Sequence, residues 1–123
     1  MSKPYRILVV DDEPSLLLIV TKRLESEGFM VTTAEDGEEA LQKVKLTPPH
    51  LIILDVMMPK LDGYEVCKRL KQDPQTQAIP IIFLSAKSKE SWKKQGLELG
   101  ASAFLTKPFK SQELLAEIRK LLP

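Results

Sequence analysis

Short runs of consecutive apolar residues constrain the fold of this chain more than any other feature. They are Ile7–Val10, Leu51–Leu54, Ile81–Leu84 and the weaker Ala103–Leu105. A strand with one face in water alternates apolar and polar residues, whereas a strand buried on both faces does not. The runs therefore predict a parallel sheet that is covered by helices on both sides. A further run, Phe29–Ala34, is partly polar, and we expect it nearer an edge of the sheet.

Segments with apolar residues at helical spacing separate these runs. Proline suits the first turn of a helix, and glycine commonly stands just past the last turn. We expect helices from Pro14 to just before Gly28, after a cap at Asp36, over Tyr64–Leu70, over Ser88–Leu99 and after a cap at Ser111. The order strand then helix, repeated five times, favours right-handed crossovers in one parallel sheet.

Length and composition narrow the architecture further. A (β/α)₈ barrel needs about twice the 123 residues of this chain, so we expect a flavodoxin-like, doubly wound α/β sheet with helices on both faces. Hydrophobic residues make up 43% and charged residues 28%, which is typical of one globular domain over residues 1–123. The net charge of +1 argues against direct nucleic-acid binding.

Neither a membrane span nor a disulfide is expected. No apolar run approaches the ~20 residues that cross a bilayer, and the first residues lack the apolar stretch of a signal peptide. The single cysteine, Cys67, cannot form an internal disulfide, and we interpret it as a small apolar helix residue. The cytoplasm is therefore the expected compartment.

Polar residues follow the predicted strands at the point where each strand ends. They are Asp11, Asp12, Asp55, Ser85 and Lys107. In parallel sheets the carboxyl ends of the strands meet at one edge, where ligands bind. Carboxylates gathered there repel one another unless a proton or a cation compensates. Oxygen ligands of high charge suit Mg²⁺, and a carboxylate in such a site can also act as a nucleophile towards a phosphoryl group.

Taken singly, these residues have simpler explanations. Asp12 could cap the first helix, Asp55 could be a turn carboxylate, and Lys107 could be a solvated surface charge. Their agreement across separate strand ends favours a functional site.

At these residues the chain resembles the receiver domains of two-component response regulators, over nearly its whole length. The matching stretches are Ile7–Pro14, Leu51–Pro59, Asp62–Gly63, Leu84–Ala86, Gly96–Ala101 and Lys107–Phe109. Each stretch alone is a weak signal, but their order and spacing together are specific. The resemblance implies the strand order 2-1-3-4-5.

The resemblance also implies a role for each site residue. Asp55 matches the phosphoryl acceptor, and Lys107 matches the lysine that pairs with the phosphoryl group. Ser85 matches the hydroxyl that bonds this group, and Phe104 matches the aromatic residue that changes rotamer with it. The Mg²⁺ ligands implied are Asp11, Asp12, Asp55 and the backbone carbonyl of Met57. A cis peptide bond between Lys107 and Pro108 is implied as well.

Some positions depart from the commonest pattern of these domains. Ser85 stands where threonine is frequent but keeps the hydroxyl, whereas Phe104 stands where tyrosine is frequent and lacks it. The stretch Ala101–Ala103 is often acidic in DNA-binding regulators, so the partner surface is left open. Trp92 is unusual in the fourth helix, and either core packing or anchoring of a partner would explain it.

The expected function is a phosphorylation-dependent switch that catalyses only its own phosphorylation and dephosphorylation. A histidine kinase or phosphotransfer protein would supply the phosphoryl group. The changed surface of the fourth helix, fifth strand and fifth helix would regulate a protein partner or an output domain. Because the chain ends at Pro123, we expect a stand-alone or an excised receiver, either monomeric or dimerising upon phosphorylation.

Three other functions are disfavoured by particular residues. An aspartate-nucleophile phosphatase generally has a second aspartate two residues beyond the first, where this chain has Met57. A nucleotide or flavin module would need glycines or hydroxyls after the first strand, where this chain has Asp11–Pro14. An inactive pseudo-receiver would have lost the acceptor or the lysine, and both are present.

Overall fold

Five short strands alternate with five helices along the part of the chain that the structure describes. The computed structural model describes residues 4–86 and 90–122. The strands are β1 (Arg6–Val10), β2 (Met30–Ala34), β3 (Leu51–Asp55), β4 (Ile81–Ser85) and β5 (Ala103–Thr106). The helices are α1 (Pro14–Ser26), α2 (Gly37–Leu46), α3 (Gly63–Gln72), α4 (Glu90–Glu98) and α5 (Ser111–Leu121). None of these helices is both long and apolar enough to cross a bilayer.

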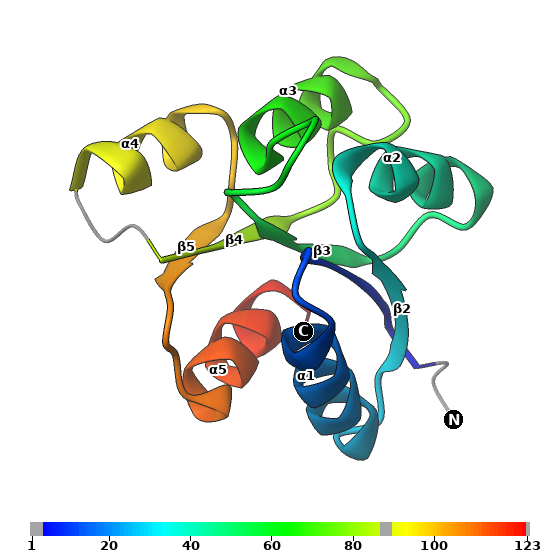
Figure 1. Ribbon diagram of the computed structural model, residues 1–123. Coiled ribbons are helices and arrows are strands. Elements are labelled where there is room, and N and C mark those ends of the chain that lie inside the picture. The colour runs from blue at the N-terminus through cyan, green and yellow to red at the C-terminus, as the bar shows by residue number, and fades with distance from the viewer. Residues whose placement is uncertain (1–3, 87–89, 123) are drawn as a thin grey trace.

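The strands form one parallel sheet in the order β2-β1-β3-β4-β5, which confirms the expected fold. Helices α1 and α5 cover one face, and α2, α3 and α4 cover the other (Figure 1). The partly polar strand β2 lies at an edge, as predicted. In the register of the sheet, Val10 pairs with both Ala34 and Leu54, so β1, β2 and β3 end at the same edge.

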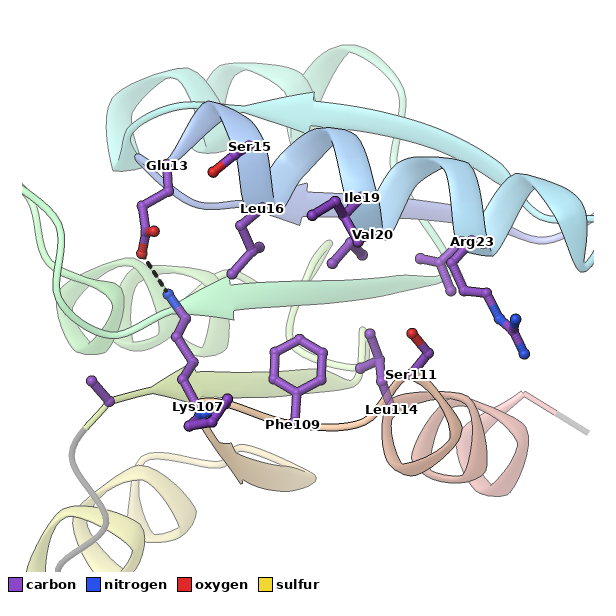
Figure 2. Close-up of a pocket in the computed structure, with 13 residues that line it drawn as sticks. Glu13, Ser15, Leu16, Ile19, Val20, Arg23, Lys107, Phe109, Ser111 and Leu114 are labelled. Atoms are coloured by element: carbon purple, nitrogen blue, oxygen red, sulfur yellow. Dashed lines mark hydrogen bonds and ion pairs between the residues drawn. The ribbon is translucent and has the colours of Figure 1, made fainter.

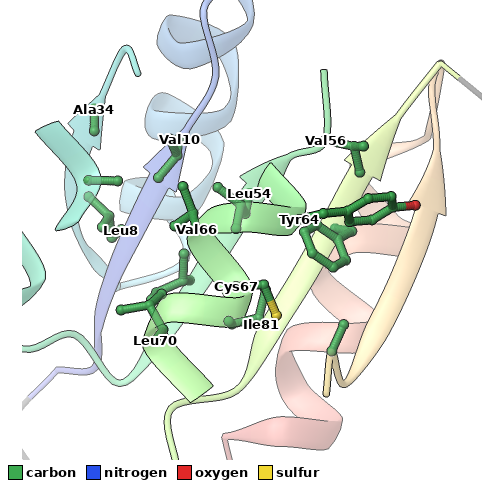
Figure 3. Packing of buried hydrophobic residues seen from close by; sticks show 14 of the residues in the cluster. Leu8, Val10, Ala34, Leu54, Val56, Tyr64, Val66, Cys67, Leu70 and Ile81 are labelled. Carbon is green, nitrogen blue, oxygen red and sulfur yellow. The ribbon is translucent and has the colours of Figure 1, made fainter. Parts of the chain in front are cut away.

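Two apolar cores lie on opposite faces of the sheet. One contains Leu8, Leu54, Val66 and Phe83 and lies on the face that α2, α3 and α4 cover. Figure 3 shows the part of this core around α3. The other contains Ile53 and further side chains that face α1 and α5. Every residue of β3 and β4 is buried, whereas every residue of β5 is only partly buried.

Helix ends follow the predicted signals in part. Helix α1 begins at Pro14, Gly28 beyond its end has φ +94°, and the Asp36 side chain accepts a hydrogen bond from the Glu39 N–H at 2.8 Å. The predicted cap at Ser111 is wrong, because Ser111 is already the first helical residue. The backbone N–H of Lys110 instead donates to the Glu113 carboxylate at 3.0 Å, which anchors this end. Ser88, the expected start of the fourth helix, lies outside the described residues.

Candidate functional site at the carboxyl edge of the sheet

Three carboxylates meet where β1 and β3 end. The pairing of Val10 with Leu54 places Asp11 and Asp12 beside Asp55. One carboxylate oxygen from each of the three lies within 4.8 Å of the others. Asp11 and Asp55 are buried, at 0% and 3% exposure, while Asp12 is exposed. Such a set of oxygen ligands can hold a hard divalent cation and leaves part of its shell to water.

Asp11 is held from two sides. One of its carboxylate oxygens accepts a hydrogen bond from the Glu13 N–H at 2.9 Å, and the other accepts from the Lys107 ammonium at 2.8 Å. The residue that caps α1 is Glu13, whose side chain makes no capping bond. The alternative explanation of Asp12 as a helix cap is therefore wrong, and its carboxylate is available at the mouth of the site.

Lys107 directly follows β5, and its side chain reaches the acidic cluster. The peptide bond between Lys107 and Pro108 is cis, as the resemblance implies. The Lys107 Nζ lies 3.4 Å from a carboxylate oxygen of Asp55. It also lies 3.4 Å from a carboxylate oxygen of Glu13, and Figure 2 marks this ion pair with a dashed line. Burial alone would lower the pKa of Lys107. The hydrogen bond that Lys107 donates to Asp11 and the negative charge of Asp55 outweigh burial and raise that pKa above its ordinary value. Lys107 is thus a charged group of the site, with its side chain only 15% exposed.

The charge of Lys107 does not balance the cluster. Burial, together with the neighbouring charge of Asp11, raises the pKa of Asp55 to about 6, although Lys107 acts in the opposite direction. A cation among the three carboxylates would favour the ionised form of Asp55, which is the nucleophilic form. The chemistry of the donor set and this uncompensated negative charge both fit a divalent metal ion.

Gly63 packs directly against the backbone of Asp55, a contact that the sequence pattern did not predict. The N–H of Gly63 donates to the Val56 carbonyl at 2.9 Å. A Cβ atom at position 63 would lie 2.2 Å from the backbone oxygen of Asp55, so no side chain fits there. The Asp62–Gly63 pair was part of the resemblance but had no assigned role. Here the Asp62 carboxylate caps α3 by accepting from the Glu65 N–H at 2.9 Å, and Gly63 lets the helix start against β3.

The two expected switch residues lie on the face of the sheet that α4 covers. Ser85 ends β4 and is fully buried. Side chains two residues apart on a strand share a face, so Ser85 points to the same side as Phe83. Phe83 pairs in register with Phe104, and their rings are 6.2 Å apart. Phe104 is partly buried. Met57, whose backbone carbonyl is an expected metal ligand, lies in the loop after β3 and is 51% exposed.

A groove leads away from Lys107 between α1 and α5 (Figure 2). It has a volume of about 540 Å³. Its walls are mainly apolar and include Leu16, Ile19, Phe109 and Leu114. Ile19 is 64% exposed, so apolar surface continues from the groove onto the outside of α1. Sequence reasoning did not predict this groove, because it depends on how two helices distant in the chain pack together.

Comparisons with known proteins agree on one family. The profile of the family described as response regulator receiver domain matches residues 7–119. A relative in Bacillus subtilis, the alkaline phosphatase synthesis transcriptional regulatory protein PhoP, is 51% identical over 117 residues, covering 95% of this chain and 48% of the relative. Response regulator PleD of Caulobacter vibrioides is 45% identical over 94% of this chain and 26% of its own length.

Solved structures agree with the sequence relatives. A putative response regulator from Chloroflexus aurantiacus superposes with a TM-score of 0.93 at 40% identity, covering 98% of each chain. The Vibrio cholerae chemotaxis protein CheY4 superposes with a TM-score of 0.91 at 34% identity, covering 97% of this chain and 99% of that chain. The beryllofluoride-activated DrrB receiver domain superposes with a TM-score of 0.88 at 33% identity, covering 97% of each chain.

Proposed function

Because the chain belongs to the response regulator receiver domain family, we propose that Asp55 is the residue that accepts the phosphoryl group. Members of this family are phosphorylation-dependent switches and not conventional enzymes. The observation that carries the assignment is the position of Asp55 at the end of the central strand, between the acidic pair and an ammonium 3.4 Å away. Asp11 has its two oxygens engaged by Glu13 and Lys107, and Asp12 is exposed, so Asp55 is the carboxylate best placed to react.

The proposed transfer starts from a phosphorylated histidine of the donor protein. A carboxylate oxygen of Asp55 attacks the phosphorus atom, an O–P bond forms, and the P–N bond to the histidine breaks with its electron pair left on the nitrogen. Lys107 neutralises charge on the phosphoryl oxygens, because its ammonium already lies beside Asp55. The reaction requires ionised Asp55, whose raised pKa of about 6 still leaves it mostly ionised at neutral pH.

The proposed metal ion is Mg²⁺. Asp11, Asp12 and Asp55 would hold it together with the backbone carbonyl of Met57, and all of these donors are oxygens. When bound, the ion would supply positive charge for the phosphoryl oxygens. Within the chain itself, Lys107 orients Asp11 and so keeps this carboxylate aimed at the cluster.

The proposed signal begins with about −2 of new charge at Asp55 and with new acceptor oxygens. The Ser85 hydroxyl donates a hydrogen bond to these oxygens and moves towards them. The space that it leaves admits the ring of Phe104, and burial of that ring favours the inward rotamer. The surface formed by α4, β5 and α5 then differs between the two states, and a partner that prefers one state responds.

The family implies a histidine kinase as partner, and a phosphotransfer protein is an alternative donor. The apolar groove beside Lys107 supports the approach of a donor at this edge of the sheet, since exposed apolar surface of this kind marks interaction sites. The chain spans about half the length of the first curated relatives it matches. We propose that residues 1–123 form one cytoplasmic receiver domain, monomeric or dimerising upon phosphorylation, which does not itself bind nucleic acid and which acts on a protein partner or an output domain.

Acetyl phosphate, a small phosphodonor, tests the assignment without a kinase. With Mg²⁺ present, intact-mass measurement should show the gain of one phosphoryl group, and Asp55→Asn should abolish that gain. Asp12→Ala should weaken Mg²⁺ binding and slow phosphorylation together. Phosphorylation of Asp55→Asn at the parent's level would refute the acceptor. Parent-like Mg²⁺ affinity in Asp12→Ala would refute Asp12 as a ligand.

A further inference from the structure

We propose that Tyr64 is a positioning residue that holds α4 in place in the unphosphorylated domain and links it to Asp55 through α3. We call the contact of Tyr64 with Trp92 the Tyr64 latch. It would act beside the Ser85–Phe104 pair and not through it. The hold on α4 is independent of the proposed function, whereas its release upon phosphorylation rests on that function.

Little of helix α4 is buried. Among its described residues, Gly96 is the only one that is buried. Leu97 is 50% exposed, and Trp92 is partly buried against the core. A helix with so little buried surface can be displaced more easily than α3, which buries Gly63, Tyr64, Val66, Cys67 and Leu70. Single contacts should therefore have a large influence on where α4 lies.

The contact between Tyr64 and Trp92 combines a hydrogen bond with ring stacking. The Tyr64 hydroxyl donates to the backbone carbonyl of Trp92 at 2.6 Å. The two rings are stacked, with centroids 6.1 Å apart and an angle of 24° between their planes. Tyr64 is only 7% exposed, and it also packs edge-on against Phe83 at 5.1 Å. A buried tyrosine fixed in this way ties α4 to the well-anchored helix α3.

Gly96 lets α4 come close enough for this contact. Trp92 and Gly96 are four residues apart and lie on the same face of the helix. A Cβ atom at position 96 would lie 3.0 Å from the ring of Phe83 and 3.2 Å from the ring of Phe104. Both distances are tighter than ordinary contacts, so a larger residue would push α4 off the two rings. The latch closes because glycine leaves that space empty.

Tyr64 is also connected to the acidic site through the residue before it. Its neighbour Gly63 packs directly against the backbone of Asp55 and donates to the Val56 carbonyl. A shift of the loop after β3 would therefore move the first turn of α3, and Tyr64 with it. Through this first turn, a change at Asp55 reaches Trp92 without involving Ser85.

Hydrogen–deuterium exchange of the free protein tests the latch in Tyr64→Phe, which removes the hydroxyl and keeps the ring. Amides of α4 should exchange roughly three- to tenfold faster, the range expected for the loss of one neutral hydrogen bond. Exchange in α1 and α5 should stay unchanged. The matched control is Tyr5→Phe, which alters the only other tyrosine of the chain. Unchanged α4 exchange in Tyr64→Phe, or an equal increase in every helix, would refute the latch.

A second variant and a second state separate the latch from the proposed function. Gly96→Ala should also speed exchange in α4, and combining it with Tyr64→Phe should add little, because both open the same contact. Beryllofluoride serves as a stand-in for the phosphoryl group. The difference in α4 amide exchange between the parent and Tyr64→Phe should be smaller with beryllofluoride bound than without it. If Tyr64→Phe is phosphorylated normally while α4 exchange is unaltered, the latch is wrong and the acceptor assignment survives. If the parent is not phosphorylated but Tyr64→Phe loosens α4, the proposed function is wrong and the hold on α4 survives.

Discussion

Strands β3 and β5 differ in a way that matches their different tasks. All five residues of β3 are buried, and Gly63 packs directly against the backbone of its last residue, Asp55. All four residues of β5 are only partly buried, and its neighbour α4 buries little besides Gly96. The proposed phosphoryl acceptor thus sits at the end of a strand that is buried throughout, and the expected signal leaves from a strand that is less buried. A reactive group needs fixed geometry, whereas a switch needs an element that costs little to move.

The largest expected effect tests this contrast in stability. Ile53→Ala in β3 empties fully buried space and should lower the free energy of unfolding by about 4 kcal/mol, within the range for such core substitutions. Leu105→Ala in β5 removes a partly exposed side chain and should cost about 1–2 kcal/mol. Urea denaturation of both variants measures the difference. Equal costs would show that β5 is as firmly packed as β3.

A somewhat smaller effect concerns the charge buried at the end of β3. The pKa of Asp55 is about 6 in the folded chain and 3.8 in a free aspartate, so between these pH values the folded state binds more protons than the unfolded state. The stability of the metal-free protein should therefore fall as pH rises from about 4 to 6. Asp55→Asn should remove that fall and be more stable than the parent by roughly 2–3 kcal/mol at pH 7.5.

Thermal or urea unfolding at several pH values in a chelator measures this effect. Glu38→Gln, which neutralises an exposed carboxylate on α2, should leave the pH dependence unchanged. The prediction would be contradicted if the free energy of unfolding of the parent, relative to that of Asp55→Asn, rose between pH 4 and 6.

The next effect concerns rate. Lys107→Ala should slow phosphorylation by acetyl phosphate at least about tenfold, because loss of one preorganised charge-stabilising group typically costs 10²–10³. Lys110→Ala, which removes an exposed ammonium three residues away, is the matched control and should be near normal. Intact-mass time courses give both rates. A parent-like rate for Lys107→Ala would remove the lysine from the mechanism.

The smallest effect concerns the coupling between the two regions. Beryllofluoride should cause NMR shifts that spread from Asp55 through Ser85 to Phe104, and through Tyr64 to Trp92. Ser85→Ala should shorten the spread towards Phe104. Coupling of this kind is typically ~1–3 kcal/mol, so populations should change without becoming all-or-none. Phe104 lacks the hydroxyl that would favour an outward position in water, so its inward rotamer should be populated even without beryllofluoride. Shifts that reach Phe104 undiminished in Ser85→Ala would contradict the proposed route.

The sequence was most informative where local patterns decide the outcome. Continuous apolar runs predicted the buried strands, and the residues after them predicted which side chains reach the edge of the sheet. Asp11, Asp12, Asp55 and Lys107 are brought together as predicted. Mg²⁺ was predicted from the chemistry of the carboxylates and is also implied by the resemblance, whereas the roles of single residues came from the resemblance. Both stay predictions.

Features that depend on packing between distant segments could not be predicted. The contact of Tyr64 with Trp92 joins residues 28 positions apart in the sequence, and neither residue type predicts that the other lies beside it. The tight fit of Gly63 against Asp55 follows from how α3 is seated on β3. Of the two explanations of Trp92, core packing is the one that its stacking on Tyr64 supports. The cap of α5 was predicted one residue too late, at Ser111, because serine is a common capping residue. The cap is Lys110, whose backbone N–H donates to the Glu113 carboxylate.

The position of Lys107 between the acidic site and the groove has a consequence for turnover. In the free domain, Lys107 bridges Asp55 and Glu13, and Glu13 also lines the groove beside α1. If the Lys107 ammonium moved towards the phosphoryl oxygens, it would neutralise the Glu13 carboxylate less. The mouth of the groove would then become more negative. A donor protein whose acidic groups face this mouth would then be bound less tightly once it had given up its phosphoryl group. Transfer would in this way promote the departure of the donor and free the same surface for the next encounter.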